Sequence, residues 1–155
     1  MRFVGNIIWF VFGGALISLI WLIGAVFFAL TIVGLPLARA AIEMAKLSAF
    51  PFGKEVIHIR ELDGKGLSVK TAATGTIGFV MNLLWAFSFG WILFMGYIVA
   101  GVVNCIFIIS IPFGLQAFKL AGISFWPIGR RVVTKELAQA ARVQNAADKL
   151  AKIRA

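Results

Sequence analysis

The sequence predicts an all-α integral membrane protein made of two tandem repeats, each with a long transmembrane helix and a shorter helix preceded by proline, plus a small cytoplasmic β element. The first observation behind this prediction is composition, since the 155 residues are 61% hydrophobic and 14% charged, with a mean hydropathy of +0.98. A soluble globule of this size needs more polar surface than such a chain provides. The second observation is a repeat, in which FPFGKEV at positions 50–56 returns 76 positions later as WPIGRRV.

The repeat aligns residues 3–57 with residues 79–133 at one constant offset and without a gap. An apolar composition alone would give chance matches of Ile, Val, Phe and Ala, but hardly paired polar, aromatic and turn residues. We therefore predict membrane repeat 1 (1–57), a polar connector forming a β-hairpin (58–76), membrane repeat 2 (77–133) and a basic helical cytoplasmic tail (134–155). The paired residues include Asn6/Asn82, Trp9/Trp85, Pro36/Pro112, Pro51/Pro127 and Gly53/Gly129.

The first repeat opens with a long apolar run, from Phe3 to Leu35, that contains no charged residue. A straight bilayer-spanning helix takes about 20 residues, so this run holds at least one crossing but is too short for two full spans. Gly34 and Pro36 then predict a turn or kink. The next helix, over residues 37–50, would be about 21 Å long and falls short of a span by itself.

Two arrangements fit these lengths. In the first, each repeat is a hairpin, and both of its ends face the cytoplasm. In the second, the long helix crosses once and the shorter helix lies at the interface, which leaves the two repeats inverted. Cytoplasmic segments carry an excess of Lys and Arg, so the basic residues Lys54, Arg60, Lys65 and Lys70 and the basic tail favour the hairpin and a cytoplasmic C-terminus.

Small residues form a smooth face on each shorter helix. Such faces let helix backbones approach closely in lipid, where van der Waals contact replaces the missing hydrophobic drive. We hypothesise that the two faces meet across a pseudo-twofold axis. They consist of Ala41, Ala45 and Ser48 in the first repeat and Ala117, Ala121 and Ser124 in the second.

The connector differs from the membrane repeats in its pattern. Residues 56–62 include a β-prone run, residues 63–66 are a turn cluster, and residues 67–71 could return as a second strand. Val132 and Val133 of the second repeat could pair with this segment, giving a small sheet that ties the repeats together at the surface. A plain flexible linker is the remaining alternative.

The second repeat runs apolar from Phe79 to Pro112 and continues with a shorter segment that ends at Trp126. Tryptophan is enriched at membrane interfaces, so we predict a membrane-surface anchor made of Trp126, Arg130 and Arg131. Thr134 can then cap an Ala-rich cytoplasmic helix that extends to about residue 154.

The residues that usually carry chemistry are scarce. The chain has one histidine, one cysteine and six acidic residues, without metal-ligand spacing or a phosphate loop. We predict no enzyme activity, no catalytic residue, no metal and no cofactor. Residues 130–155 hold seven Lys or Arg against two acidic residues, but no nucleic-acid motif accompanies them. The expected partners are membrane lipids, further copies of the chain and a partner membrane protein, not nucleic acid.

The intramembrane polar residues are the candidate pore-lining or packing sites. They are Asn6, Asn82, Asn104, Glu43 and Lys119. The two asparagines that begin the long helices can cap them or bond between helices, or they can line a pore. Glu43 aligns with Lys119 in the repeat and could pair with it, or it could pair with Arg39 and Lys46 on its own helix.

Four stretches resemble the YccF family of small bacterial inner-membrane proteins: LP at 35–36, KLSAFPFGKEVIHIREL at 46–62, IPFGLQAFKLAGISFWPIGRRVV at 111–133, and the short Ala/Arg-rich tail. The resemblance covers nearly the whole chain and implies a bacterial inner-membrane location. It brings no established activity, cofactor or catalytic residue. We interpret the matching residues as a stop at the membrane surface followed by a turn and a cationic anchor; they are Pro51, Gly53, Trp126, Pro127, Gly129, Arg130 and Arg131.

Two function classes follow from these observations. The first is an oligomeric channel or transport component, which the interrupting prolines and the membrane-embedded Asn104, Glu43 and Lys119 suggest. So few helices cannot enclose water, so a channel requires a homo-oligomer. The alternative is a membrane scaffold that binds lipid or a partner protein through Arg130, Arg131 and the basic tail.

Overall fold

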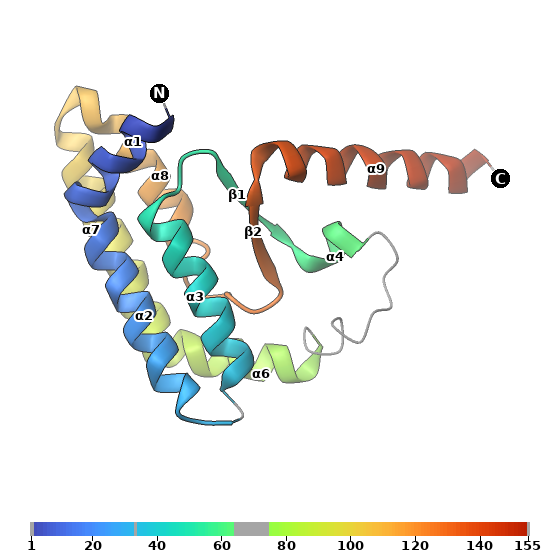
Figure 1. The fold of residues 1–155 in the computed structure, drawn as a ribbon, viewed down its shortest axis with the longest axis horizontal. Helices are drawn as coiled ribbons and strands as arrows, with labels where there is room; N and C mark the ends of the chain where they lie inside the picture. The colour runs from blue at the N-terminus through green and yellow to red at the C-terminus, as the bar shows by residue number, and fades with distance from the viewer. Residues whose placement is uncertain (1, 33, 64–74, 155) are drawn as a thin grey trace.

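The chain begins with a bent apolar helix. The computed structural model describes residues 2–32, 34–63 and 75–154 (Figure 1). Helix α1 (Arg2–Trp9) passes through a π-helical turn, η1 (Phe10–Gly14), into α2 (Ala15–Ala29). Gly13 has a φ of 146° inside η1, a conformation that side chains with a Cβ rarely adopt, and it bends the helix there.

The first hairpin is completed by α3 (Leu35–Ala49), which folds back on α2 after a short turn. Pro36 lies in the first turn of α3, where its missing N–H costs no intrahelical hydrogen bond. The predicted turn and the shorter helix that follows a proline are both present.

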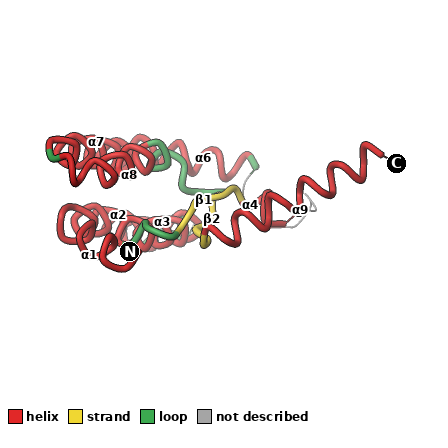
Figure 2. The backbone as a smooth tube through the Cα atoms, turned by 90° about the horizontal axis from the view of Figure 1, so that it is seen from above, coloured by secondary structure: helices red, strands yellow, loops and turns green. Residues whose placement is uncertain are grey.

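The second hairpin has the same order of elements. Helix α6 (Thr76–Trp85) leads through a second π-helical turn, η2 (Ala86–Gly90), into α7 (Trp91–Ile106). A 3-10 turn, η3 (Ile108–Ser110), then leads into α8 (Ile111–Ala121). Helix α7 runs antiparallel to α2, and α6 lies across the foot of the bundle in Figure 1. Figure 2 shows α1, α2 and α3 in one layer and α6, α7 and α8 in the other.

Both bent helices are long and apolar enough to cross a membrane. The continuous helical segments are Phe3–Ala29, with 27 residues and a mean hydropathy of 2.4, and Thr76–Ile106, with 31 residues and a mean hydropathy of 2.0. Their large apolar side chains are mostly exposed, as a helix surrounded by lipid requires.

A two-stranded antiparallel sheet joins the hairpins. Strand β1 (Lys54–His58) pairs with β2 (Arg130–Thr134), and Val56 lies opposite Val132 in the register. The pairing predicted between the first run and Val132–Val133 is therefore confirmed, and the hairpin predicted within the connector is wrong in its first half. The strand ends at His58, and residues 59–63 form a short helix, α4 (Ile59–Asp63). The predicted return strand at 67–71 lies outside the described residues.

Each strand follows a turn that requires glycine. Gly53 has a φ of 94° and Gly129 a φ of 90°, both in the left-handed region that other residues avoid. Each glycine comes two residues after a buried proline, Pro51 or Pro127. The Pro-x-Gly motifs that the sequence singled out are therefore tight turns between a membrane helix and a strand.

The core lies between the two hairpin layers and is mainly aromatic. Trp21 and Trp85 stack with ring centroids 4.9 Å apart, and both are almost completely buried with Tyr97. Offset aromatic pairs of this kind contribute about 0.5–1.5 kcal/mol beyond the area they bury.

The small-residue faces do not meet each other, which corrects the sequence-based hypothesis. The face of α3 packs against α2, where Ser18 Oγ donates to the Ala45 carbonyl over 3.0 Å. The face of α8 packs in the same way against α7. The physical reason is the short turn within each hairpin, which brings adjacent helices together. The small faces allow the closest approach, so they are buried in the contact within each hairpin.

The chain ends in α9 (Lys135–Arg154), which projects away from the bundle beyond the sheet (Figures 1 and 2). Thr134 Oγ1 accepts the Leu137 N–H over 3.3 Å, so the predicted cap is present. Arg142 anchors the helix by donating to Glu55 of β1 over 2.7 Å.

Candidate functional site

Two of the predicted polar residues tie the start of each hairpin to its end. Asn82 Nδ2 donates to the Ile128 carbonyl over 3.2 Å, and its Oδ1 accepts the Ile128 N–H over 2.9 Å. Asn6 makes the same two bonds with Phe52, at 3.1 Å and 2.9 Å. Both asparagines lie inside helices and not at N-caps, because α1 and α6 begin several residues earlier. Their amides satisfy turn backbone that would otherwise be left without partners.

The tryptophans one turn further along make a second pair of equivalent ties. Trp9 Nε1 donates to the Ser48 carbonyl over 2.6 Å, and Trp85 Nε1 donates to the Ser124 carbonyl over 2.9 Å. The Ser48 carbonyl lies in the last turn of α3, which has no intrahelical donor, and the Ser124 carbonyl lies in the turn that follows α8. Each hairpin is therefore closed at its polar end by one asparagine and one tryptophan.

The other predicted site residues lie apart from one another. Asn104 is buried and donates to the Ala100 carbonyl of its own helix over 2.7 Å. Trp126 is half-buried and lies against Phe79, with ring centroids 5.5 Å apart. Lys119 is exposed on α8, near enough to Glu55 for its charge to act on that carboxyl.

Glu43 pairs with Arg131 of β2, and no ion pair between Glu43 and Lys119 occurs in the described part of the chain. Both side chains are partly exposed, at 30% for Glu43 and 48% for Arg131. An ion pair in such a setting stabilises a fold by about 0–1 kcal/mol. Its main effect is to hold β2 against α3.

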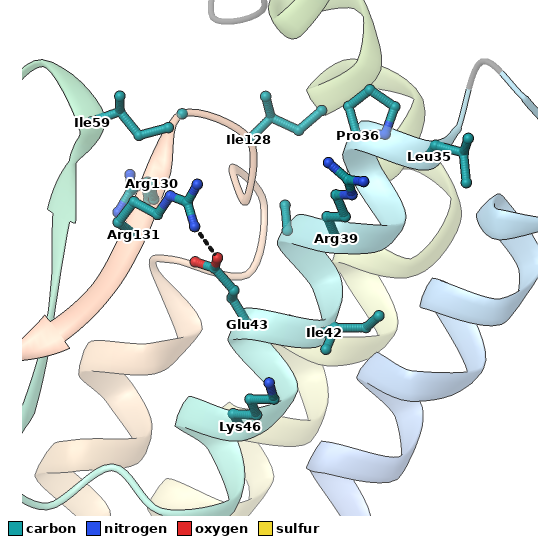
Figure 3. A pocket seen from close by; sticks show the side chains of 12 residues that line it. Leu35, Pro36, Arg39, Ile42, Glu43, Lys46, Ile59, Ile128, Arg130 and Arg131 are labelled. Carbon is teal, nitrogen blue, oxygen red and sulfur yellow. Dashed lines mark hydrogen bonds and ion pairs between the residues drawn. The ribbon is translucent and has the colours of Figure 1, made fainter. Parts of the chain in front are cut away.

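This ion pair lies in a pocket between α3 and the sheet (Figure 3). The pocket has a volume of about 710 Å³ and is lined by residues from α3, from the start of α4 and from the turn that leads into β2. Four of its lining side chains are cationic and one is acidic: Arg39, Lys46, Arg130, Arg131 and Glu43.

Arg130 is the cation most affected by its surroundings. It is half-buried, and burial lowers the pKa of its guanidinium because the charged form loses hydration. Among the side chains that the structure describes, no carboxylate forms an ion pair with Arg130 or Arg39. The pocket therefore keeps uncompensated positive charge on both sides, from Arg39 on α3 and from Arg130 on β2.

Part of the pocket lining is apolar. Leu35 and Ile42 lie on α3 on either side of Arg39 and remain exposed, and Ile128 is a buried part of the lining (Figure 3). A pocket that combines cations with exposed aliphatic side chains suits a ligand that is both anionic and apolar. Sequence reasoning placed Arg39 and Lys46 beside Glu43 on one helix. It missed that Arg130 and Arg131 join them, because only the contact of β2 with α3 brings these segments together.

No group of three or more His, Cys, Asp and Glu side chains that could hold a metal ion occurs among the described residues. The polar side chains that line the pocket are arginine, lysine and one carboxylate, which can pair charges and form hydrogen bonds.

Comparison with known proteins places the chain in a family. The sequence model of the YccF family, described as an inner membrane component domain, matches residues 4–54 and residues 80–130. The chain is 46% identical over 146 residues to the inner membrane protein YccF of Escherichia coli strain K12, covering 94% of this chain and 97% of that protein. It is equally similar to the YccF protein of Shigella flexneri. No solved structure matches the chain. The chain belongs to the YccF family of inner membrane proteins.

Proposed function

We propose that this protein is a membrane scaffold that binds the headgroup of an anionic phospholipid in the pocket between α3 and the sheet. The observation that carries the proposal is the pocket itself, in which Arg39 and Arg130 supply cations and Leu35 and Ile42 supply exposed apolar side chains. A phosphodiester fits the fork of an arginine guanidinium, and acyl chains fit beside aliphatic side chains.

The acidic residue of the pocket reduces its positive charge without removing it. Glu43 neutralises Arg131 but leaves Arg39, Lys46 and Arg130 to attract an anion. A membrane-embedded protein meets phospholipid at a far higher concentration than any soluble anion, which favours a lipid as the occupant over free phosphate.

The test is lipid retention, measured by native mass spectrometry after exchange from nanodiscs of phosphatidylglycerol or phosphatidylcholine. We expect bound phosphatidylglycerol and little bound phosphatidylcholine. Arg39→Gln and Arg130→Gln should each weaken phosphatidylglycerol binding about tenfold, because a hydrogen bond to a charged group contributes about 1.5–3 kcal/mol. Lys152→Gln, at the far end of α9, removes the same charge and should change binding less than about twofold.

Two further results would decide against a phospholipid. If all three variants lose binding equally, the attraction is that of a basic surface and not of a built pocket. If inorganic phosphate at millimolar concentration displaces the lipid and binds equally well to protein in phosphatidylcholine, the site is one for a soluble phosphate.

An oligomeric channel or transport component is the second candidate. Trp21, Trp85 and Tyr97 fill the space between the hairpin layers, so a conducting path would run between copies of the chain. A symmetric assembly of three or more copies in native mass spectrometry, followed by ion flux in liposomes, would support conduction. A monomer or dimer leaves too few helices around any axis and would rule it out.

We further propose that the two hairpins are copies of one unit related by a twofold axis. The supporting observations are the paired π-helical turns and the sheet register, in which Val56 faces Val132 at the offset seen in the sequence. Equivalent hydrogen bonds from Asn6 and Asn82 support the same relationship. Exchanging residues 4–54 for residues 80–130, and the reverse, should give a folded chain if the units are equivalent.

A further inference from the structure

The sheet and α9 lie beside the hairpin bundle and not beyond the ends of its helices (Figure 1). If α2, α3 and α7 ran along the membrane normal, the sheet and α9 would therefore lie at the depth of the bilayer. That orientation would place the charges of Arg130, Lys135 and Arg142 among acyl chains. A charge at that depth is costly. Arg130 and Lys135 have no ion-pair partner among the described side chains, and with the Arg142–Glu55 ion pair they make this orientation strongly unfavourable.

The turns of the two hairpins have the opposite character. No charged residue occurs in positions 3–38 or 71–118, which include both turns. Leu30 and Ile32 in the first turn are 82% and 88% exposed, and Ile108 in the second is 85% exposed. Turns that face water carry polar residues, so these two turns are suited to contact with acyl chains.

The straight parts of the bent helices are short. Helix α2 has 15 residues and α7 has 16, so they extend about 22 Å and about 24 Å. The hydrocarbon core of a bilayer is about 30 Å thick. The bend at Gly13 separates α1 from α2, so the full length of the first apolar helix is not available along one direction.

The polar ends of the two hairpins lie at opposite ends of the bundle, at α1 and at α6, but both lead into the strands on the side that carries the sheet (Figure 1). Asn6 and Asn82 tie the start of each hairpin to the turn that precedes each strand, and the strands pair with each other. The exposed cations Lys46 and Lys119 lie on the two shorter helices, close to this side. The backbone carbonyl of Lys46 accepts a hydrogen bond from Lys54 at the start of β1, and the charge of Lys119 lowers the pKa of Glu55 in the same strand.

We propose that both hairpins insert from the cytoplasmic side into one leaflet, with α2 and α7 deepest and parallel to the membrane plane, and that neither hairpin reaches the periplasm. The apolar faces then contact the acyl chains of that leaflet, and the sheet and α9 lie in the cytoplasm. This insertion does not rest on phospholipid binding in the pocket, because it follows from the positions of the charged segments and of the turns.

Cysteine labelling tests the proposal. Single cysteines are placed at Ile32, Ile108 and Val143 in a Cys105→Ala background, all at exposed positions where a cysteine displaces no packing. A membrane-impermeant maleimide is applied to intact cells with a permeable outer membrane, and separately to inverted inner-membrane vesicles. Val143→Cys on α9 is the control for a cytoplasmic site.

We expect Val143→Cys to react at least about tenfold more in inverted vesicles than from the periplasmic side. Ile32→Cys and Ile108→Cys should react from neither side and should react fully after denaturation in detergent. Reaction of either turn from the periplasm, at the level of the denatured sample, would overturn the proposal. Reaction of Val143→Cys from the periplasm would overturn the cytoplasmic side.

A second readout removes the ambiguity of an unreactive cysteine. Nitroxides attached at Ile32→Cys and Ile108→Cys are relaxed by oxygen, which dissolves in acyl chains, or by a water-soluble nickel chelate. One-leaflet insertion predicts that oxygen relaxes both labels and that the nickel chelate relaxes neither. Relaxation of either label by the nickel chelate would place that turn in water and contradict the proposal.

Discussion

The indole N–H of Trp21 donates to the phenol oxygen of Tyr97 over 3.1 Å, and the two residues lie 76 positions apart, at the same offset as the repeat in the sequence. The Ser48 hydroxyl donates to the Met44 carbonyl over 2.7 Å, so its oxygen accepts the proton of Tyr97. This buried chain of hydrogen bonds connects α2, α7 and α3. Among the described residues, it contains the only hydrogen bonds between buried side chains that join the two layers.

Tyr97→Phe should lower the free energy of unfolding by about 1–3 kcal/mol, because it leaves the buried Trp21 N–H without an acceptor. Denaturant unfolding in detergent micelles, followed by tryptophan fluorescence, measures the loss. The double variant Trp21→Phe/Tyr97→Phe removes donor and acceptor together and should lose less than the sum of the single variants. Strict additivity would mean that the bond does not couple the layers.

Asn82→Ala should destabilise the protein by about 2 kcal/mol or more, because it strips both backbone partners from Ile128 in a buried site. Asn6→Ala removes the same two bonds from Phe52, but the site is partly exposed and water can replace them, so we expect about 1 kcal/mol. Thermal unfolding in detergent compares the two variants with Gln144→Ala, an exposed control on α9. Equal losses for both asparagines would contradict the role assigned to burial.

Gly53→Ala and Gly129→Ala should each cost about 1–2 kcal/mol, because their φ angles of 94° and 90° are strained for any residue with a Cβ. Gly122→Ala is the matched control, since Gly122 has a φ of −64° and a Cβ there would meet nothing closer than 3.9 Å. That variant should be neutral or slightly more stable. If the three variants unfold alike, the turns before the strands do not depend on glycine.

Glu43→Gln should increase phosphatidylglycerol binding about threefold to tenfold, because it removes the single carboxylate among the cations of the pocket. Its effect on the free energy of unfolding should stay below about 1 kcal/mol, since the pair with Arg131 is partly exposed. Asp148→Asn makes the same charge change on α9 and should leave lipid binding within about twofold. An equal increase in both variants would mean that net charge alone governs binding.

The attachment of α9 to β1 should weaken in acid. The hydrogen bond from Arg142 and the positive charges of Arg142, Lys119 and Lys135 hold the pKa of the Glu55 carboxyl below its ordinary 4.5. The stabilisation is therefore complete above pH 4.5 and is lost as the pH falls through the lowered value. Hydrogen exchange in α9 should rise only below that pH, and Glu55→Gln should remove this dependence. Loosening of α9 near neutral pH would contradict the assignment.

Much of the secondary structure follows from local sequence. The absence of charge from Phe3 to Leu35 predicts the long helix, Pro36 predicts the start of the next one, and Thr134 predicts the cap of α9. Local patterns also predict the strand near Val56 but not its end at His58, because the β-prone residues beyond it fold into α4 in contact with α9. Asn145 of α9 supplies that contact by donating to the Glu61 carbonyl over 2.7 Å.

The sequence could identify the charged residues of the candidate site but not which of them contact one another. The charge of Arg130 and Arg131 after a Pro-x-Gly turn signals a polar surface, whereas the pairing of Glu43 with Arg131 depends on where β2 lies against α3. The repeat suggested Lys119 as the partner of Glu43, since the two positions are aligned. Aligned positions need not contact each other in the fold: Trp21 and Tyr97 are aligned and hydrogen-bonded, whereas Glu43 pairs with Arg131 and not with Lys119.

The sequence by itself determined that this is a membrane protein with two long apolar segments, each followed by a shorter helix, and it located the turns, because composition, proline and glycine act through the local backbone. Only the tertiary structure decided that the small faces close each hairpin, that Glu43 meets Arg131, and that the sheet lies beside the helices. These relationships join segments far apart in the chain. They depend on which surfaces fit when the layers pack, and no periodicity along the sequence records that fit.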